Sequence, residues 1–137
     1  MYIKQDNSYT LSRSEKEKEY NFMLSVTGEQ IEDIVITALE TGIYYWAVLN
    51  NTTTDWANKP DRMPVSQYAV QLLLEGKTLE FSDIENGSVT MLTLKDLLHG
   101  VRLTAVNESW DFDFDDFDSN TADCIFQYAM FGEIIYS

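Results

Sequence analysis

The sequence of 137 residues is poor in cysteine, histidine and proline and short of positive charge. Its one cysteine, Cys124, excludes an internal disulfide and is typical of a reducing cytosol. No apolar run approaches the roughly 18 residues that a membrane-spanning helix needs, and no signal peptide opens the chain. We therefore expect a cytoplasmic protein that is neither exported by that route nor membrane-spanning.

Basic residues are scarce, with 9 Lys and Arg against 23 Asp and Glu and a formal charge of −14. Residues 1–27 balance to zero, so the whole excess falls in residues 28–137. Direct binding to nucleic acid or to an anionic membrane needs a basic patch, which the sequence lacks. The partners that this charge favours are basic surfaces, including those of proteins that themselves bind nucleic acid.

The rest of the composition is typical of a folded domain. Apolar residues make up 45% of the chain and aromatic residues 13%, which is ample for a packed core, and the length suits one domain. Residues 1–19 are polar and lack periodicity, so we expect a loosely held arm there, from which Tyr2 and Ile3 can add an edge strand. A single α+β domain is expected over residues 20–137.

Periodicity predicts the element order βαβαββααβ, with helices packed on a mixed sheet of about five strands. Thr27 and Gln30 have the spacing of a capping box that begins the first helix, and Gly42 is expected to end it. Residues 43–49 are aromatic or branched with no polar face, which predicts a central strand buried on both sides. The other predicted elements are strands over residues 20–26, 79–81, 89–91 and 134–136, helices over residues 65–75, 94–105 and 120–130, and a hairpin turn at Asn86-Gly87.

The most informative feature is an acidic block between Glu108 and Glu133 that contains no Lys or Arg. Crowded like charges cost folding free energy, so a block this dense usually serves a partner, a cation or solubility. Its acidic members are Glu108, Asp111, Asp113, Asp115, Asp116, Asp118, Asp123 and Glu133.

The first helix carries a second acidic feature. Helical spacing places Glu29, Asp33 and Glu40 on the face opposite Ile31, with Glu32 at its flank. An acidic helix face is often only solvated, but two acidic features in a chain with so few bases suggest a shared purpose. The predicted partner-binding residues are Glu29, Asp33, Glu40, Glu108, Trp110, Asp111, Asp113, Asp115, Asp116 and Asp118.

Metal binding by the acidic block is an alternative with weaker support. Asp111, Asp113 and Asp115 match the first three ligand positions of a helix-loop-helix calcium loop. Asp116, however, stands where that loop needs glycine, and Ala122 stands where it needs a bidentate glutamate. A two-metal catalytic site would need carboxylates from several elements and a nearby base, whereas these acids are consecutive. We expect no metal or other cofactor.

The sequence contains none of the common catalytic motifs, so we expect a protein that is not an enzyme. The single histidine, His99, falls on the side of its helix away from the leucine stripe, and Cys124 lies in an apolar helix where a thiol packs as a small hydrophobe. Trp56 and Trp110 are expected to anchor their loops on the core, with a binding role as the alternative. Leu103, opposite the stripe, is either covered or part of an apolar contact patch.

Three segments, residues 31–46, 94–100 and 122–136, resemble a pattern in small acidic proteins carried by phages and mobile elements of Gram-positive bacteria. The similarity covers roughly residues 25–137 and implies no particular activity or catalytic residues. A phage setting implies a host-defence inhibitor, such as an anti-CRISPR or anti-restriction protein, acting in the cytoplasm of the bacterial host cell. The Asp-Phe-Asp-Phe-Asp-Asp-Phe-Asp run is more acidic than the pattern, so a role tied to it belongs to this chain.

Together these observations predict a non-enzymatic inhibitor that docks an acidic, nucleic-acid-mimicking surface onto a basic nucleic-acid-binding protein, such as a CRISPR or restriction nuclease. One alternative is a small-ligand-binding protein that sequesters its ligand in a pocket lined by Tyr44, Tyr45 and Trp46. A second alternative is the calcium-binding acidic loop. An enzyme of unknown type is a third class without motif support.

Overall fold

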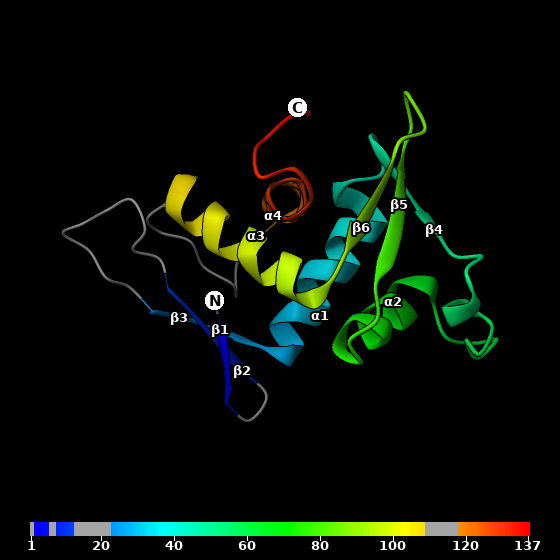
Figure 1. Ribbon diagram of the computed structural model, residues 1–137, viewed down its shortest axis with the longest axis horizontal. Coiled ribbons are helices and arrows are strands. Elements are labelled where there is room, and N and C mark those ends of the chain that lie inside the picture. The colour runs from blue at the N-terminus through cyan, green and yellow to red at the C-terminus, as the bar shows by residue number, and fades with distance from the viewer. Residues whose placement is uncertain (1, 6–7, 13–22, 109–117) are drawn as a thin grey trace.

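The computed structural model describes residues 2–5, 8–12, 23–108 and 118–137 and shows an α+β fold, as predicted (Figure 1). Its strands are β1 (Tyr2–Gln5), β2 (Ser8–Ser12), β3 (Met23–Thr27), β4 (Ala47–Asn50), β5 (Leu79–Asp83) and β6 (Val89–Leu92). Its helices are α1 (Gly28–Thr37), α2 (Val65–Leu74), α3 (Leu94–Asn107) and α4 (Ser119–Phe131), with a π-helical turn η1 (Ala38–Gly42) and a 3-10 turn η2 (Thr54–Trp56).

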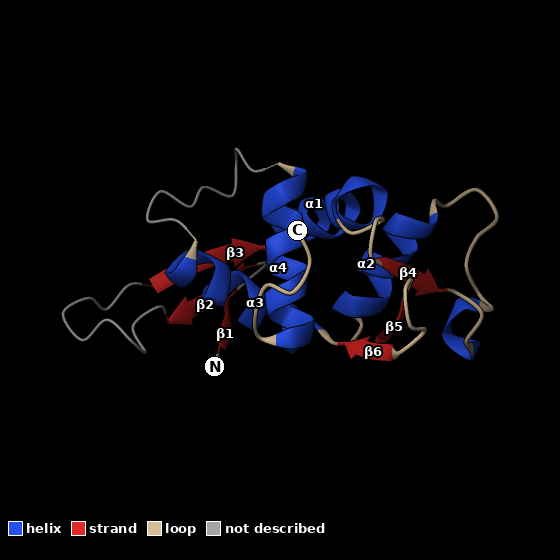
Figure 2. Ribbon diagram, turned by 90° about the horizontal axis from the view of Figure 1, so that it is seen from above, coloured by secondary structure: helices blue, strands red, loops and turns tan. Residues whose placement is uncertain are grey.

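The strands form two separate antiparallel sheets of three strands, in the orders β1-β2-β3 and β4-β5-β6. Figures 1 and 2 show the sheets at opposite ends of the molecule, with the helices between them. The prediction of one mixed sheet of about five strands therefore differs from the structure, in which every described strand pair is antiparallel. Strands β1 and β2 fall within residues 1–19, where an edge strand at Tyr2 and Ile3 was predicted. β1 is an edge strand of its sheet, whereas β2, which pairs with both β1 and β3, was not predicted.

Helix α1 begins at the predicted capping box. The Thr27 hydroxyl accepts from the Gln30 backbone N–H at 3.1 Å, and the Gln30 side chain accepts from the Thr27 backbone N–H at 2.9 Å. The helix then widens into η1, where the Ile43 backbone N–H donates to the carbonyl of Ala38, five residues earlier. Gly42 ends this turn, as predicted. A Cβ there would lie 3.0 Å from the Ser119 carbonyl oxygen, so the turn packs closely against α4.

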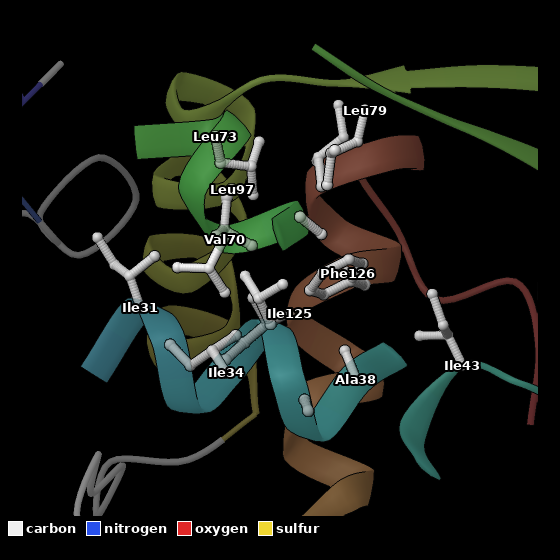
Figure 3. Packing of buried hydrophobic residues seen from close by; sticks show 14 of the residues in the cluster. Ile31, Ile34, Ala38, Ile43, Val70, Leu73, Leu79, Leu97, Ile125 and Phe126 are labelled. Atoms are coloured by element: carbon white, nitrogen blue, oxygen red, sulfur yellow. The ribbon is translucent and has the colours of Figure 1, made fainter. Parts of the chain in front are cut away.

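The hydrophobic core lies where the four helices meet the inner face of the second sheet (Figure 3). Apolar side chains spaced three and four apart on each helix turn inward, and alternate residues of β5 cover them. The core residues labelled in Figure 3 are Ile31, Ile34, Ala38, Ile43, Val70, Leu73, Leu79, Leu97, Ile125 and Phe126.

The prediction of a central strand over residues 43–49 is wrong. The chain turns at residues 43–46, and β4 begins only at Ala47 and forms an edge of its sheet. Ile43 and Trp46 are buried against helices rather than between strands, while Tyr44 is 68% exposed and Val48 51% exposed. A run of bulky apolar residues is compatible with a buried turn as well as with a strand.

The C-terminal residues 133–137 form no strand, although one was predicted over residues 134–136. The side chain of Gln127 takes the place of a strand partner. Its carbonyl oxygen accepts from the backbone N–H groups of Ile135 and Tyr136, both at 2.8 Å, and its amide donates to the Tyr136 carbonyl at 3.0 Å. One side chain on α4 thus satisfies three backbone groups of this segment.

Helices α3 and α4 cross at close range. Figure 1 looks along α4 while α3 runs across the view. A Cβ on Gly100 would lie 2.4 Å from the Ile125 carbonyl oxygen and 2.7 Å from the Ala129 Cβ, so only glycine fits at the crossing. This contact fixes α4, which begins after its N-cap Asp118 and carries Asp123; both residues are considered below.

Candidate functional site

The first candidate surface is the acidic stripe of α1 and η1, formed by Glu29, Asp33 and Glu40. All three side chains are exposed, as is Glu32, which lies nearer to α2. The opposite side of the helix buries Ile31 completely, which confirms the predicted division of the helix into an acidic and an apolar face. The stripe therefore presents its carboxylates to solvent on a helix that the core holds in place.

The centre of the acidic block, with Trp110, Asp111, Asp113, Asp115 and Asp116, lies outside the described residues. Its two described ends, Glu108 and Asp118, are both exposed.

Both ends of the block have structural partners. Glu108 accepts a hydrogen bond of 2.5 Å from the Tyr128 hydroxyl, and Asp118 caps α4 by accepting from the Thr121 backbone N–H at 3.0 Å. Glu108 and Asp118 thus support the fold as well as adding negative charge.

Among the described residues, no ion pair involves a carboxylate of the acidic stripe. Within the described part of the chain, the single ion pair joins Lys77 Nζ to Asp55 Oδ1 at 3.9 Å, and neither residue belongs to the acidic stripe. Lys59 Nζ donates instead to the backbone carbonyls of Pro60 and Met63. Arg102 lies against the exposed His99 at 2.8 Å.

A groove of about 450 Å³ opens beside the acidic stripe, between η1, the start of α2 and β4. We call it the Tyr44 groove. Its walls are mainly apolar, and Glu40 is the only charged residue that lines it. The buried hydroxyl of Ser66 donates to Glu40 Oε2 at 3.0 Å, which fixes the carboxylate at the groove. Sequence reasoning placed Glu40 on the stripe but missed Ser66, because the two residues meet only in the folded chain.

A second polar centre forms around Asp123 on α4. Its carboxylate accepts from the Tyr45 hydroxyl at 2.5 Å, from the Trp46 indole N–H at 2.8 Å and from the Gln127 amide at 2.9 Å. The Trp46 ring stacks on Tyr136 with centroids 5.1 Å apart. This carboxylate, which the sequence places in the acidic block, is therefore an internal acceptor that joins the turn at residues 43–46 to α4.

The three aromatic residues of the predicted ligand pocket do not line one groove together. Tyr44 lines the Tyr44 groove, Tyr45 lines a separate groove beside Asp123, and Trp46 is only 3% exposed. No groove formed by the described residues is lined by all three side chains. The reason is that residues 43–46 turn, whereas the prediction assumed an extended strand.

Trp56, Leu103 and Cys124, three other positions considered in the sequence, are each buried or partly buried. Trp56 is buried with its ring 5.3 Å from that of Tyr68, so it anchors its loop, as expected. Leu103 is half-buried. Burial, followed by the nearby carboxylates of Glu108, Asp123 and Asp118, raises the pKa of the Cys124 thiol to about 11, so the thiolate that nucleophilic chemistry requires is scarce at neutral pH. No group of three or more His, Cys, Asp or Glu side chains among the described residues is arranged to hold a metal ion.

Comparisons of the chain with protein-family models, curated proteins and solved structures return no match. The described helices include none that is both long and apolar enough to cross a membrane.

Proposed function

We propose that this protein is a non-enzymatic inhibitor that occupies the basic groove of a nucleic-acid-binding defence protein, such as a CRISPR or restriction nuclease, in the bacterial cytoplasm. The observation that carries the proposal is the exposed acidic stripe of Glu29, Asp33 and Glu40, which no Lys or Arg of the described residues neutralises. Asp111, Asp113, Asp115 and Asp116, at the centre of the acidic block, add to the same excess of negative charge in the sequence.

The physical basis is competition with a polyanion. A helix rises 1.5 Å per residue, so Glu29 and Asp33 are about 6 Å apart along the axis of α1, close to the separation of two base-pair steps of duplex DNA. Carboxylates held at such spacing on a rigid helix can displace the counterions of a basic groove as phosphates do. Binding of this kind requires uncompensated negative charge rather than a catalytic group.

The test is a DNA-cleavage assay with a panel of purified restriction nucleases and CRISPR effector complexes. We expect the protein to inhibit at least one of them in competition with DNA. The triple variant Glu29→Gln, Asp33→Asn, Glu40→Gln should inhibit at least about tenfold less well, because each exposed charge contact contributes a fraction of the binding free energy.

The matched control neutralises three exposed carboxylates outside both the acidic stripe and the acidic block, with Asp61→Asn, Glu75→Gln and Glu85→Gln. It changes the net charge by the same amount and should retain inhibition. Equal loss in both triple variants would show that only net charge matters, and inhibition that does not compete with DNA would contradict mimicry. A third variant, Asp111→Asn, Asp113→Asn, Asp115→Asn, Asp116→Asn, measures how much the acidic block contributes to inhibition.

The second candidate function is sequestration of a small ligand, for which the Tyr44 groove is the supporting observation. Ionic strength separates the two functions. Inhibition through the acidic stripe should weaken steeply as salt rises, whereas binding in a largely apolar groove should change little.

A further inference from the structure

The Tyr44 groove combines an apolar lining with one oriented carboxylate. Leu39, Ile43, Val48 and Val65 supply apolar surface, and Tyr44 adds an aromatic ring that is 68% exposed. Glu40, from the π-helical turn, supplies the only formal charge among the lining residues. The groove thus differs from the rest of the acidic stripe, where the carboxylates stand in open solvent.

Glu40 is held by one of its two oxygens. Oε2 accepts from Ser66, whose side chain is only 6% exposed, so the hydrogen bond is sheltered. Within the described residues, no donor reaches the second oxygen, Oε1, which remains available to a ligand. An oriented carboxylate with a free oxygen is a preorganised acceptor for a cationic donor.

The start of α2 also borders the groove, and its dipole attracts anions. Its N-cap is Pro64, which provides no side-chain hydrogen bond to the first turn. The positive end of a helix is equivalent to about half an elementary charge, whereas the Glu40 carboxylate carries a full negative charge. The groove therefore keeps a net negative character, and an anionic ligand would meet Glu40 at its only charged position.

We propose that the Tyr44 groove binds one alkylammonium or alkylguanidinium group, supplied by a lysine or arginine side chain of the protein partner. The aliphatic stem packs on the apolar wall, the cation pairs with Glu40 Oε1, and the Tyr44 ring adds a cation–π contact. That the side chain belongs to a basic protein rests on the proposed function. The groove itself can be tested without any partner.

The experiment is a titration of the ¹⁵N-labelled protein followed by amide chemical shifts, with three probes of similar size: n-butylguanidinium, n-butanol and butyrate. We expect butylguanidinium to shift the amides of residues around the groove in a saturable manner, with no saturable shift from butyrate. Butanol should bind at least about fivefold more weakly than butylguanidinium, because it lacks the charge-assisted hydrogen bond.

Three variants identify the groups that bind the probe. Glu40→Gln should weaken butylguanidinium binding about tenfold, and Tyr44→Leu should weaken it about two- to fivefold. Glu75→Gln, at the end of α2 opposite the groove, is the control and should leave the affinity unchanged. Equal shifts with butanol, or unchanged affinity in Glu40→Gln, would overturn the inference. Either result leaves the nuclease assay untouched, and a failed nuclease assay leaves this titration valid, so the two failures are distinguishable.

Discussion

Asp123 is the residue that holds the turn at residues 43–46 against α4. Its carboxylate accepts from Tyr45, Trp46 and Gln127, and Trp46 is nearly enclosed. The variant Asp123→Ala leaves these donors without their acceptor, which should lower the free energy of unfolding by about 2–4 kcal/mol. Urea denaturation followed by tryptophan fluorescence measures the loss. The control Asp33→Ala removes an exposed carboxylate and should change stability by less than about 0.5 kcal/mol; similar losses in both variants would contradict this role.

Three tyrosines each donate a hydrogen bond to a carboxylate, and the pKa of each tyrosine is raised. The pairs are Tyr45 with Asp123, Tyr128 with Glu108 and Tyr136 with Asp83. Burial is the largest cause for Tyr45 and Tyr128, and the hydrogen bond to Asp83 is the largest cause for Tyr136. An unfolded tyrosine ionises near pH 10, before these folded ones do.

The consequence is a loss of stability in alkaline solution. The stabilisation is fully present below about pH 10 and is lost as the pH rises towards the higher pKa values of the folded state. Urea unfolding at about pH 8 and about pH 11, with tyrosinate absorbance recorded in parallel, measures the effect. Tyr128→Phe, which removes one of the three hydroxyls, should reduce the loss between the two pH values. A midpoint independent of pH over this range would show that the prediction is wrong.

Cys124 should react slowly with alkylating reagents because burial raises the pKa of its thiol to about 11. At pH 8 the thiolate fraction is then about a thousandth, against a much larger fraction for an unfolded cysteine with a pKa near 8.5. Iodoacetamide labelling followed by mass spectrometry, with and without denaturant, compares the two states. Equal labelling rates would contradict the burial of this thiol.

Some of these residue roles are visible in the sequence and others are not. The capping box at Thr27 and Gln30 follows from a spacing of three, and the exposed stripe of α1 follows from helical period. The acceptor role of Asp123 depends on Trp46, 77 positions away, so no local pattern reveals it. The same holds for the hydrogen bond between Ser66 and Glu40, which orients the proposed binding carboxylate.

At the scale of elements, the crossing of α3 and α4 requires Gly100. In an ordinary helix, glycine to alanine is stabilising by up to about 1 kcal/mol. Here the added Cβ would overlap the Ile125 carbonyl and Ala129, so Gly100→Ala should instead destabilise the protein by about 3 kcal/mol. Thermal and urea unfolding measure the change. Lys95→Ala, on the exposed side of α3, is the control and should be nearly neutral; a stabilised Gly100→Ala variant would show that the helices can move apart.

The two mistaken strand predictions share a physical cause. Residues 43–49 and 134–136 are apolar and branched or aromatic, but burial can be achieved without a strand ladder when other groups satisfy the backbone. For Tyr136 and its neighbour, the Gln127 side chain supplies those hydrogen bonds. By contrast, the Asn86-Gly87 hairpin was predicted correctly, because Gly87 has the positive φ, 72°, that its turn demands.

At the scale of the whole molecule, composition gives the net charge but does not show which carboxylates support the fold and which remain exposed to a partner. Asp123, Glu108 and Asp118 belong to one acidic block in the sequence, yet each accepts hydrogen bonds that support α4 or its contacts. The stripe of α1 and η1 is different, since only Glu40 among its members has a partner within the described residues. The number of sheets was also predicted wrongly, because it depends on which strands pair with one another, and the sequence pattern of a single strand does not reveal its partner.

Net charge predicts opposite effects of salt on stability and on binding. With −14 charges and one ion pair among the described residues, repulsion destabilises the folded chain, and salt screens it as the Debye length falls from about 10 Å at 0.1 M to about 3 Å at 1 M. The urea midpoint should therefore rise with NaCl, while inhibition of a nuclease through the acidic stripe should fall. The triple variant Glu29→Gln, Asp33→Asn, Glu40→Gln should show a smaller salt effect on both quantities. If salt strengthened inhibition, the contact with the partner would be chiefly apolar, and the acidic stripe would serve solubility alone.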